Sequence, residues 1–404
     1  MNLINMLRQH PLSKTLAFST AEYAGRLEAV RLAMGMAGVD ILLVGNSANQ
    51  CWLTGYESVM PSAPTLAIVP ASGPVEMISA DLDASCIELY STVTTVHVEG
   101  WSTGRDITTI LLERLRDLGA DHKTVGVELG KVDGYASMGI DAATYLVLVE
   151  QLSKSRWVDT TLLIPQLRLI KSPVELEYMR LAGQYTEQGM KAAIDAIAVG
   201  KTDNDIAAAY YHAATVAGSE VMSIDPQIVT GERCGYMPFL TYKRIPLKQG
   251  DTVYLECTGV HQRYNAPLMR SAVIGQPNDT ALRIADIALE IMDELLAAIA
   301  PGRNGLDIAS EMAPLVKRLP EGCYFSGTYG YATGLGMQPT WSEYPAYIAD
   351  GMEFELAENM TFHTPIAIWS VRDRVGVGFS ETIKVTGSGC ELITPGGFRE
   401  LVVR

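Results

Sequence analysis

The stretch Gly250-Asp-Thr-Val-Tyr-Leu-Glu-Cys-Thr-Gly-Val-His-Gln-Arg-Tyr-Asn-Ala-Pro-Leu-Met-Arg270 predicts two strands joined by a polar turn. Its alternation puts Val253 and Leu255 on one face of the first strand, and Tyr254 and Glu256 on the other. A carboxylate in the middle of an apolar strand is unfavourable unless it has partners or a chemical role. Glu256 is therefore the first candidate functional residue.

The composition predicts a globular protein of two domains, because 404 residues are too many for one small core. Hydrophobic residues make up 48% of the chain and charged residues 19%, as in folded proteins. A net charge of -15 without a Lys/Arg cluster argues against nucleic-acid binding, since phosphate contacts need a basic face. No apolar run approaches the ~18 residues of a membrane-spanning helix, and no secretory signal is visible. We expect a cytoplasmic protein without a membrane partner.

The cysteines and histidines are scattered along the chain, without Cys-x-x-Cys or His-x-x-x-His spacing. At this length a disulfide framework is not expected, and reduced thiols are the simpler interpretation. The histidine spacing gives no sign of a metal site.

Strands and helices alternate in the first part of the chain. A capping box at Ser19–Glu22 opens a helix that Gly38 closes, and Ile41–Val44 is the first buried strand. Further strands are expected at 66–69, 75–78, 94–98 and 124–127, with helices at 107–118 and 142–152. This alternation predicts an α/β domain with a mostly parallel sheet. No G-x-G-x-x-G motif follows the first strand, so no dinucleotide cofactor is expected.

The second domain begins after a boundary near 159–171, and we assign residues 1–165 and 166–404 to the two domains. Ser172-Pro-Val-Glu175 starts a helix whose predicted apolar stripe is Tyr178, Leu181, Ala182 and Tyr185. Helices at 203–216, 280–299 and 306–315 and strands at 224–230, 252–258, 267–274, 360–369 and 379–385 follow. Helices segregated from antiparallel strand pairs predict an α+β domain.

Several motifs in this second domain occur in a recognisable order. They are Arg168-Leu-Ile-Lys-Ser-Pro-Val-Glu-Leu-Glu-Tyr-Met-Arg180, Gly250-Asp251, the glycine-rich Tyr329-Gly-Tyr-Ala-Thr-Gly-Leu-Gly336 and Ser380-Glu-Thr-Ile-Lys-Val-Thr386. They resemble the pita-bread domain shared by creatinase, prolidase and methionine aminopeptidase. Trp52-Leu-Thr-Gly-Tyr56 resembles the creatinase-like N-terminal domain, so the resemblance covers essentially the whole chain. It implies a homodimer in which the N-terminal domain helps to close the partner's site.

The chain departs from this family at the metal ligands. Prolidase-like enzymes bind two metal ions through two aspartates, one histidine and two glutamates. At or near the positions of those ligands this chain has, in the same order, Glu256, Pro267, Tyr331, Pro365 and Ser380. Proline and tyrosine do not complete a cage of oxygen ligands for a hard cation. We therefore predict no metal and no other cofactor.

Two metal-free branches of the family remain. Creatinase uses a histidine shortly before the Gly-Asp turn, where this chain has Phe239. The chain is more similar to ectoine hydrolase in Glu256, Arg263–Arg270, Gly330-Tyr331, Trp341-Ser-Glu343, Met360-Thr-Phe-His363 and Ser380-Glu-Thr382. Ectoine is a small cyclic amidine bearing a carboxylate, and that branch opens its ring by hydrolysis. Because we also expect ectoine hydrolases to retain the histidine, Phe239 leaves ectoine, creatine and related compounds open as substrates.

The catalytic candidates are Glu256, His363 and Tyr331. Glu256 would attract a cationic substrate and act as base or nucleophile; the alternative is a structural carboxylate paired with Arg263 or Arg270. His363 would relay a proton or orient Glu256, or else be a satisfied core histidine. Tyr331 would donate to developing negative charge, or else fill the core.

The substrate-binding candidates are aromatic, amide or charged side chains on the matching motifs. They are Trp52, Tyr56, Tyr264, Asn265, Arg270, Trp341, Glu343 and Glu381. Trp52 and Tyr56 would stack on a flat cation, and as residues of the N-terminal domain they would act across a subunit interface. Glu343 and Glu381 would bind an ammonium or amidinium group, and Arg270 would clamp a carboxylate.

The leading hypothesis is a metal-independent hydrolase of a C–N bond in a small zwitterionic amidine or guanidino acid, with ectoine first. The alternatives are a creatinase-like amidinohydrolase, an Xaa-Pro aminopeptidase-like protein and a non-catalytic pita-bread module that binds peptides.

Overall fold

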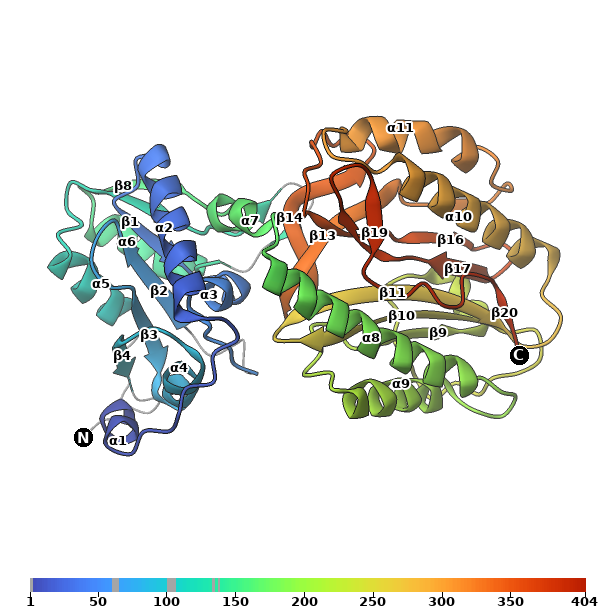
Figure 1. The fold of residues 1–404 in the computed structure, drawn as a ribbon, viewed down its shortest axis with the longest axis horizontal. Coiled ribbons are helices and arrows are strands. Elements are labelled where there is room, and N and C mark those ends of the chain that lie inside the picture. The colour runs from blue at the N-terminus through green and yellow to red at the C-terminus, as the bar shows by residue number, and fades with distance from the viewer. Residues whose placement is uncertain (1–2, 60–64, 100–106, 133–134, 137–138) are drawn as a thin grey trace. The chain divides into compact units, whose positions relative to one another are not determined.

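The computed structural model describes residues 3–59, 65–99, 107–132, 135–136 and 139–404. The chain divides into two compact units, Met1–Arg168 and Leu169–Arg404. Figure 1 labels their helices and strands.

The first unit contains a six-stranded sheet in the order β4-β3-β2-β1-β5-β8. Its strands are β1 (Ile41–Val44), β2 (Thr65–Pro70), β3 (Glu76–Ala80), β4 (Thr95–Glu99), β5 (Thr124–Val127) and β8 (Arg156–Asp159). The β1–β5, β3–β4 and β5–β8 pairs are parallel, whereas β2 runs antiparallel to β1 and β3. The predicted α/β domain with a mostly parallel sheet is confirmed. A short hairpin of β6 (Lys131–Val132) and β7 (Tyr135–Ala136) stands apart from this sheet.

The helices of the first unit begin and end on the expected signals. They are α1 (Leu3–Gln9), α2 (Thr20–Ala37), α3 (Ser47–Thr54), α4 (Ala84–Tyr90), α5 (Ile107–Asp117), α6 (Ala142–Gln151) and α7 (Leu163–Arg168). The Ser19 hydroxyl accepts from the Glu22 N–H and caps α2, and Gly38 ends that helix at φ 64°. Among the described residues no helix is both long and apolar enough to cross a membrane.

The second unit is organised around the predicted strand pair. β10 (Thr252–His261) and β11 (Tyr264–Val273) are antiparallel in an unbroken register from Thr252↔Val273 to His261↔Tyr264. They belong to a nine-stranded sheet in which β9 (Gln227–Thr230) is one edge and the order is β19-β18-β15-β13-β11-β10-β9. The other strands of this sheet are β13 (Thr328–Met337), β14 (Thr340–Ala349), β15 (Thr361–His363), β18 (Thr382–Val385), β19 (Cys390–Leu392) and β20 (Val402–Val403).

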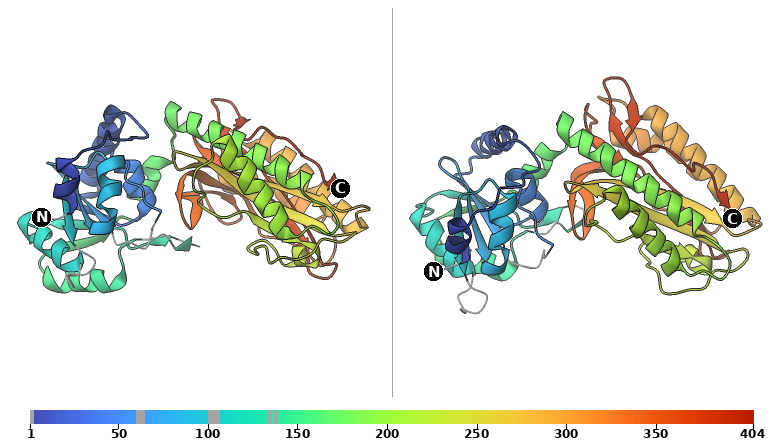
Figure 2. Two further views of the ribbon diagram at one scale, coloured as in Figure 1. Left: turned by 90° about the horizontal axis from the view of Figure 1, so that it is seen from below. Right: turned by 60° about the horizontal axis from the view of Figure 1, so that its bottom comes forward.

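Helices lie on both sides of the β9–β11 strands (Figures 1 and 2). α8 (Pro173–Asp195) and α9 (Asp203–Ala217) pack on the face that carries Val253 and Leu255. The opposite face carries Tyr254 and faces a second, three-stranded sheet of β12 (Cys323–Phe325), β16 (Ile366–Ser370) and β17 (Val375–Phe379). α10 (Asp279–Ala298) packs on β16 and β17, with α11 (Gly305–Val316) beside it. The α+β pita-bread domain is as predicted.

The predicted apolar stripe of α8 is only partly right: Ala182 is buried, but Tyr178, Leu181 and Tyr185 are only partly buried. Ser172 and Glu175 form the expected capping box, but the buried side of the helix includes Leu176, Met179 and Gly183. The backbone of α8 approaches its neighbours so closely that a Cβ at Gly183 would lie 2.7 Å from the carbonyl oxygen of Ile393. Only small side chains fit at such a contact, so the larger tyrosines are displaced to its flanks.

Candidate active site

Glu256 lies on β10, which runs between the edge strand β9 and β11. Its cross-strand neighbours are Met269 on β11 and Gln227 on β9. The side chain is buried, with 4% of its residue surface exposed, and the Tyr254 hydroxyl donates to Oε2 over 2.7 Å. Burial raises the pKa of Glu256 to about 7, because loss of water disfavours the charged form. At neutral pH this carboxyl group is therefore poised between its acid and its base forms.

His363 is the second buried titratable group and sits at the end of β15, opposite Tyr331 of β13. Its Nδ1 lies 2.8 Å from the Tyr331 hydroxyl and its Nε2 lies 2.7 Å from Oγ of Ser380. Burial lowers the pKa of His363 to about 3, so the ring is neutral. In a neutral imidazole one nitrogen donates and the other accepts, so His363 joins the two hydroxyl groups in a directional chain.

Met269 joins this chain to Glu256. Its N–H donates to Oγ of Ser380 over 2.6 Å, and the same residue is the cross-strand neighbour of Glu256. Trp341 also contacts this chain of hydrogen bonds: its indole N–H donates to the Tyr331 hydroxyl over 2.8 Å. We call Tyr254, Glu256, Tyr331, His363 and Ser380 the polar cluster. His363 and Tyr331 are thus in direct contact, and Glu256 is linked to them through Met269.

The residues of the polar cluster do not fit the pair of metal ions that prolidase-like enzymes bind. Of the aligned ligand positions only Glu256 carries a carboxylate, while Tyr331 and Ser380 are hydrogen-bonded to His363. In the part of the chain that the structure describes, no group of three or more His, Cys, Asp or Glu side chains is arranged to hold a metal ion. Hard divalent cations need several oxygen ligands, and these residues do not supply them.

Arg270 and Glu381 were both predicted to bind substrate, but they bind each other. Nη2 of Arg270 lies 2.7 Å from Oε1 of Glu381, and both side chains are completely buried. Arg270 pairs across the ladder with Leu255, whose side chain faces the helices, whereas Glu256 points to the opposite face. The structure therefore supports neither a carboxylate clamp nor a pairing of Arg270 with Glu256.

We expect Arg270→Met to lower the free energy of unfolding by about 3–4 kcal/mol, because it leaves the Glu381 carboxylate buried without a cation. Urea unfolding would measure this loss. Arg318→Met is the matched control: its partner Glu290 is 2.6 Å away but both side chains are exposed, so the change should stay within about 1 kcal/mol. Replacing both Arg270 and Glu381 by apolar residues should recover much of the stability. Equal losses at the buried and the exposed pair would contradict this interpretation.

Two other predicted binding residues, Glu343 and Tyr264, have charged partners inside the protein. Glu343 lies 2.6 Å from Nζ of Lys171 in a second buried ion pair. The Tyr264 hydroxyl donates to Glu175 at the start of α8 over 2.5 Å.

Asn265 differs from these residues because its Nδ2 donates to backbone carbonyls, while its Oδ1 is buried without a partner among the described residues. Trp341, in contrast, hydrogen-bonds to the polar cluster through the Tyr331 hydroxyl.

Trp52 and Tyr56 lie in the core of the first unit. Trp52 is 5% exposed, and the guanidinium of Arg26 lies over its ring at 5.0 Å from the centroid. Tyr56 is 3% exposed, and burial raises the pKa of its phenol far above the ordinary value. The cation that Trp52 contacts thus belongs to the protein, and the structure does not support stacking of either ring on a substrate.

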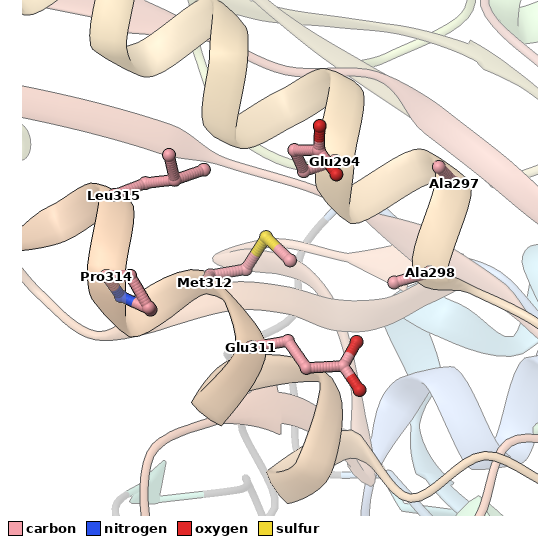
Figure 3. Close-up of a pocket in the computed structure, with 7 residues that line it drawn as sticks. All are labelled: Glu294, Ala297, Ala298, Glu311, Met312, Pro314 and Leu315. Carbon is pink, nitrogen blue, oxygen red and sulfur yellow. The ribbon is translucent and has the colours of Figure 1, made fainter.

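A pocket of about 420 Å³ lies between α10 and α11 (Figure 3). It is lined by Glu294, Ala297, Ala298, Glu311, Met312, Pro314 and Leu315. None of these residues belongs to the polar cluster, and Glu311 is already paired with Arg303. We do not assign the reaction to this pocket.

Tyr254 and Ser380 belong to the site but were not among the predicted site residues. The signal for Tyr254 was its position two residues before Glu256, which places both on one face of the strand. Ser380 was aligned with a former metal ligand, yet its contact with His363 depends on the pairing of β15 with β18, which the sequence does not reveal.

Comparison with known proteins agrees with this architecture. Residues 177–387 match metallopeptidase family M24, and residues 26–170 match the creatinase/prolidase N-terminal domain. Ectoine hydrolase from Halomonas elongata is 28% identical over 94% of this chain and 96% of its own. Xaa-Pro dipeptidase from Pyrococcus horikoshii is 25% identical over 72% of this chain and 85% of its own.

Solved structures show the same fold. Prolidase from Thermococcus sibiricus has a TM-score of 0.82 at 18% identity, covering 96% of this chain and all of that one (100%). Prolidase from Pyrococcus horikoshii has a TM-score of 0.77 at 20% identity, covering 92% and 98%. The family matches agree with the two-unit fold and with the order of the motifs. This chain belongs to metallopeptidase family M24, with a creatinase/prolidase N-terminal domain in front of its M24 domain.

Proposed function

We propose that this protein is a hydrolase that cleaves a C–N bond of a small cyclic amidine or guanidino acid without a metal ion, with ectoine as the first candidate substrate. The observation that carries the proposal is the environment of Glu256. Its carboxylate is buried, and among the described residues the Tyr254 hydroxyl is its one hydrogen-bond partner. A buried charge without a cation is unfavourable, and a cationic substrate would supply the missing partner.

The chemistry follows from that pairing. The amidinium carbon is electrophilic, and the Glu256 carboxylate either takes a proton from water that attacks this carbon or attacks it directly. When water attacks, the C–O bond forms, the C–N bond breaks, and the nitrogen leaves as an amine after receiving a proton. When Glu256 attacks, the same steps leave the substrate carbon bonded to the Glu256 oxygen, and water then cleaves that bond and restores the carboxylate. The elements of one water molecule are added overall. Tyr254 stabilises the carboxylate by donating to it, which keeps the base from becoming permanently protonated.

The Tyr331–His363–Ser380 chain would serve the proton transfers. A neutral imidazole between two hydroxyl groups can accept a proton on one nitrogen and release one from the other. Because the pKa of His363 is about 3, the imidazolium form would exist only briefly and would return its proton readily. We therefore assign the leaving-group proton to this chain.

The relatives support a hydrolytic function without choosing the bond. The ectoine hydrolase relative favours the amidine, and the Xaa-Pro dipeptidase relative favours a prolyl peptide. The residues at the aligned metal positions argue against the prolyl peptide, because they include Pro267 and Pro365, which do not bind a metal ion through their side chains. A creatinase-like guanidino substrate presents the same planar N–C–N cation, with a third nitrogen on the central carbon, and Phe239 does not separate the two classes.

The proposal predicts binding and turnover of an amidine in the presence of a chelator. A thermal-shift screen of ectoine, hydroxyectoine, creatine and guanidinoacetate should show one stabilising ligand, by about 2.7 kcal/mol at 100 times its dissociation constant. Release of the amine product should proceed at the same rate with and without EDTA. Activity that appears only after addition of Mn²⁺ or Co²⁺, or turnover of Xaa-Pro peptides alone, would refute the proposal.

We also propose that the active form is a cytoplasmic homodimer, as the family resemblance implies. Sedimentation equilibrium should give twice the chain mass of 43.8 kDa. A monomer at concentrations that support full turnover would remove the dimer from the proposal but leave the chemistry intact.

A further inference from the structure

Gln227 stands beside Glu256 at the edge of the sheet. The antiparallel register of β9 and β10 places Gln227 directly opposite Glu256. Opposite residues of an antiparallel pair share a face, with Cβ atoms about 4.5–5.5 Å apart. The neighbouring pairs confirm the faces: Val229 and Tyr254 pack together on this side, whereas Ile228 and Leu255 pack toward the helices.

The amide oxygen of Gln227 lacks a donor. Oε1 is buried and has no hydrogen-bond partner within the described ranges, although the residue as a whole is partly buried. A buried acceptor without a donor is unfavourable. Two acceptors thus lie side by side, the Glu256 carboxylate of the polar cluster and the Gln227 amide oxygen. Among the described residues, the Tyr254 hydroxyl donates to the first and no group donates to the second. Other buried polar atoms also lack partners, but this one adjoins the candidate catalytic group.

We propose that Gln227 is a specificity residue that accepts a hydrogen bond from the second nitrogen of a bound amidinium or guanidinium group. This inference rests on the proposed function. A planar N–C–N cation carries N–H donors on both nitrogens, so one can meet Glu256 while the other meets Gln227. On the other side of Glu256, Met269 offers an apolar surface suited to a small substituent on the central carbon.

This arrangement separates amidines from prolyl peptides. The nitrogen of an Xaa-Pro bond carries no hydrogen, so the scissile nitrogen of such a substrate would present no donor to Gln227 and would leave its amide oxygen unsatisfied. A site that is built to accept hydrogen bonds rejects analogues that lack the donor. Gln227 therefore gives the site a preference that does not depend on the shape of the rest of the substrate.

The test compares Gln227→Met with the natural protein, with ectoine and creatine as the probes. Methionine matches the length of glutamine but has no amide oxygen, so the dissociation constant and KM of the bound probe should rise about 10- to 100-fold. The turnover number should change less than about threefold, because the contact is made equally in the ground and transition states. Gln227→Glu keeps an acceptor oxygen and should bind more tightly than Gln227→Met.

Ile228→Met is the matched control, since it changes the adjacent residue on the face that packs against the helices. Its KM should equal that of the natural protein. If the natural protein binds a probe and Gln227→Met binds it equally well, Gln227 has no such role, and the proposed function stands. If neither probe binds to the natural protein, the inference and the proposed function are both overturned.

Discussion

Glu256→Gln is expected to turn over the substrate at least about a thousandfold more slowly and yet to unfold at a higher temperature than the natural protein. Glutamine has the shape of glutamate and still accepts from the Tyr254 hydroxyl, but it is neither a base nor a nucleophile. Its amide also offers a donor to the orphan oxygen of Gln227. The catalytic loss should appear in the turnover number at saturating substrate.

The gain in stability has a defined pH dependence. The pKa of Glu256 rises from 4.5 in the unfolded chain to about 7 in the fold. Below pH 4.5 both states are protonated and burial carries no charge penalty. As the pH rises from 4.5 to 7, the buried charge lowers the free energy of unfolding progressively. Above pH 7 this loss is constant, at up to about 3 kcal/mol. Thermal melts should therefore show stabilisation by Glu256→Gln at pH 8 and none near pH 4.5. Equal shifts at both pH values would show that the carboxylate is not the cause.

Such a trade of stability for activity is typical of groups that are kept in unfavourable surroundings for a chemical role. It also distinguishes Glu256 from another buried carboxylate of the second unit, Glu381. Glu381 has Arg270 as a cation, so its loss should weaken the fold, whereas loss of Glu256 should strengthen it. The opposite signs separate a structural ion pair from a catalytic carboxylate without any assay of activity.

The sequence identified Glu256 because a strand has a period of two and the flanking residues are apolar. The same periodicity predicted the β10–β11 pair and its two faces correctly. The roles of Arg270 and Glu381 could not be predicted, because they are 111 positions apart and meet only where the loop before β18 crosses β11. Periodicity describes a face of one element, but it does not say what covers that face.

The same limit applies to the aromatic residues. Trp52 and Tyr56 carry the family resemblance of the first unit, yet Trp52 contacts Arg26. Arg26 lies on α2, and β1 separates this helix from the helix α3 that carries Trp52. Strand β13, which contains the glycine-rich motif, was not among the predicted strands. Gly334 is needed there, since a Cβ at that position would lie 2.6 Å from Cε of Lys171. Glycine in this strand therefore reflects close packing around a buried ion pair.

His363 should act on stability in the direction opposite to Glu256. The unfolded chain takes up a proton on this histidine near pH 6.5, but the fold does so only near pH 3. Stability should therefore fall as the pH drops from 6.5 to 3, by up to about 5 kcal/mol from this group alone. His363→Gln removes the imidazole and should abolish that part of the acid sensitivity, as measured by urea unfolding at several pH values.

Between pH 4.5 and 6.5 the two groups oppose each other, because Glu256 ceases to destabilise the fold while His363 begins to. The His363→Gln effect is therefore best measured in the Glu256→Gln background, where the opposing titration of Glu256 is removed. His212→Gln, on the exposed side of α9, is the matched control and should leave the pH profile unchanged. If His363→Gln leaves the acid limb of the profile as steep as before, His363 is already charged in the fold. The neutral relay between Tyr331 and Ser380 would then have to be abandoned.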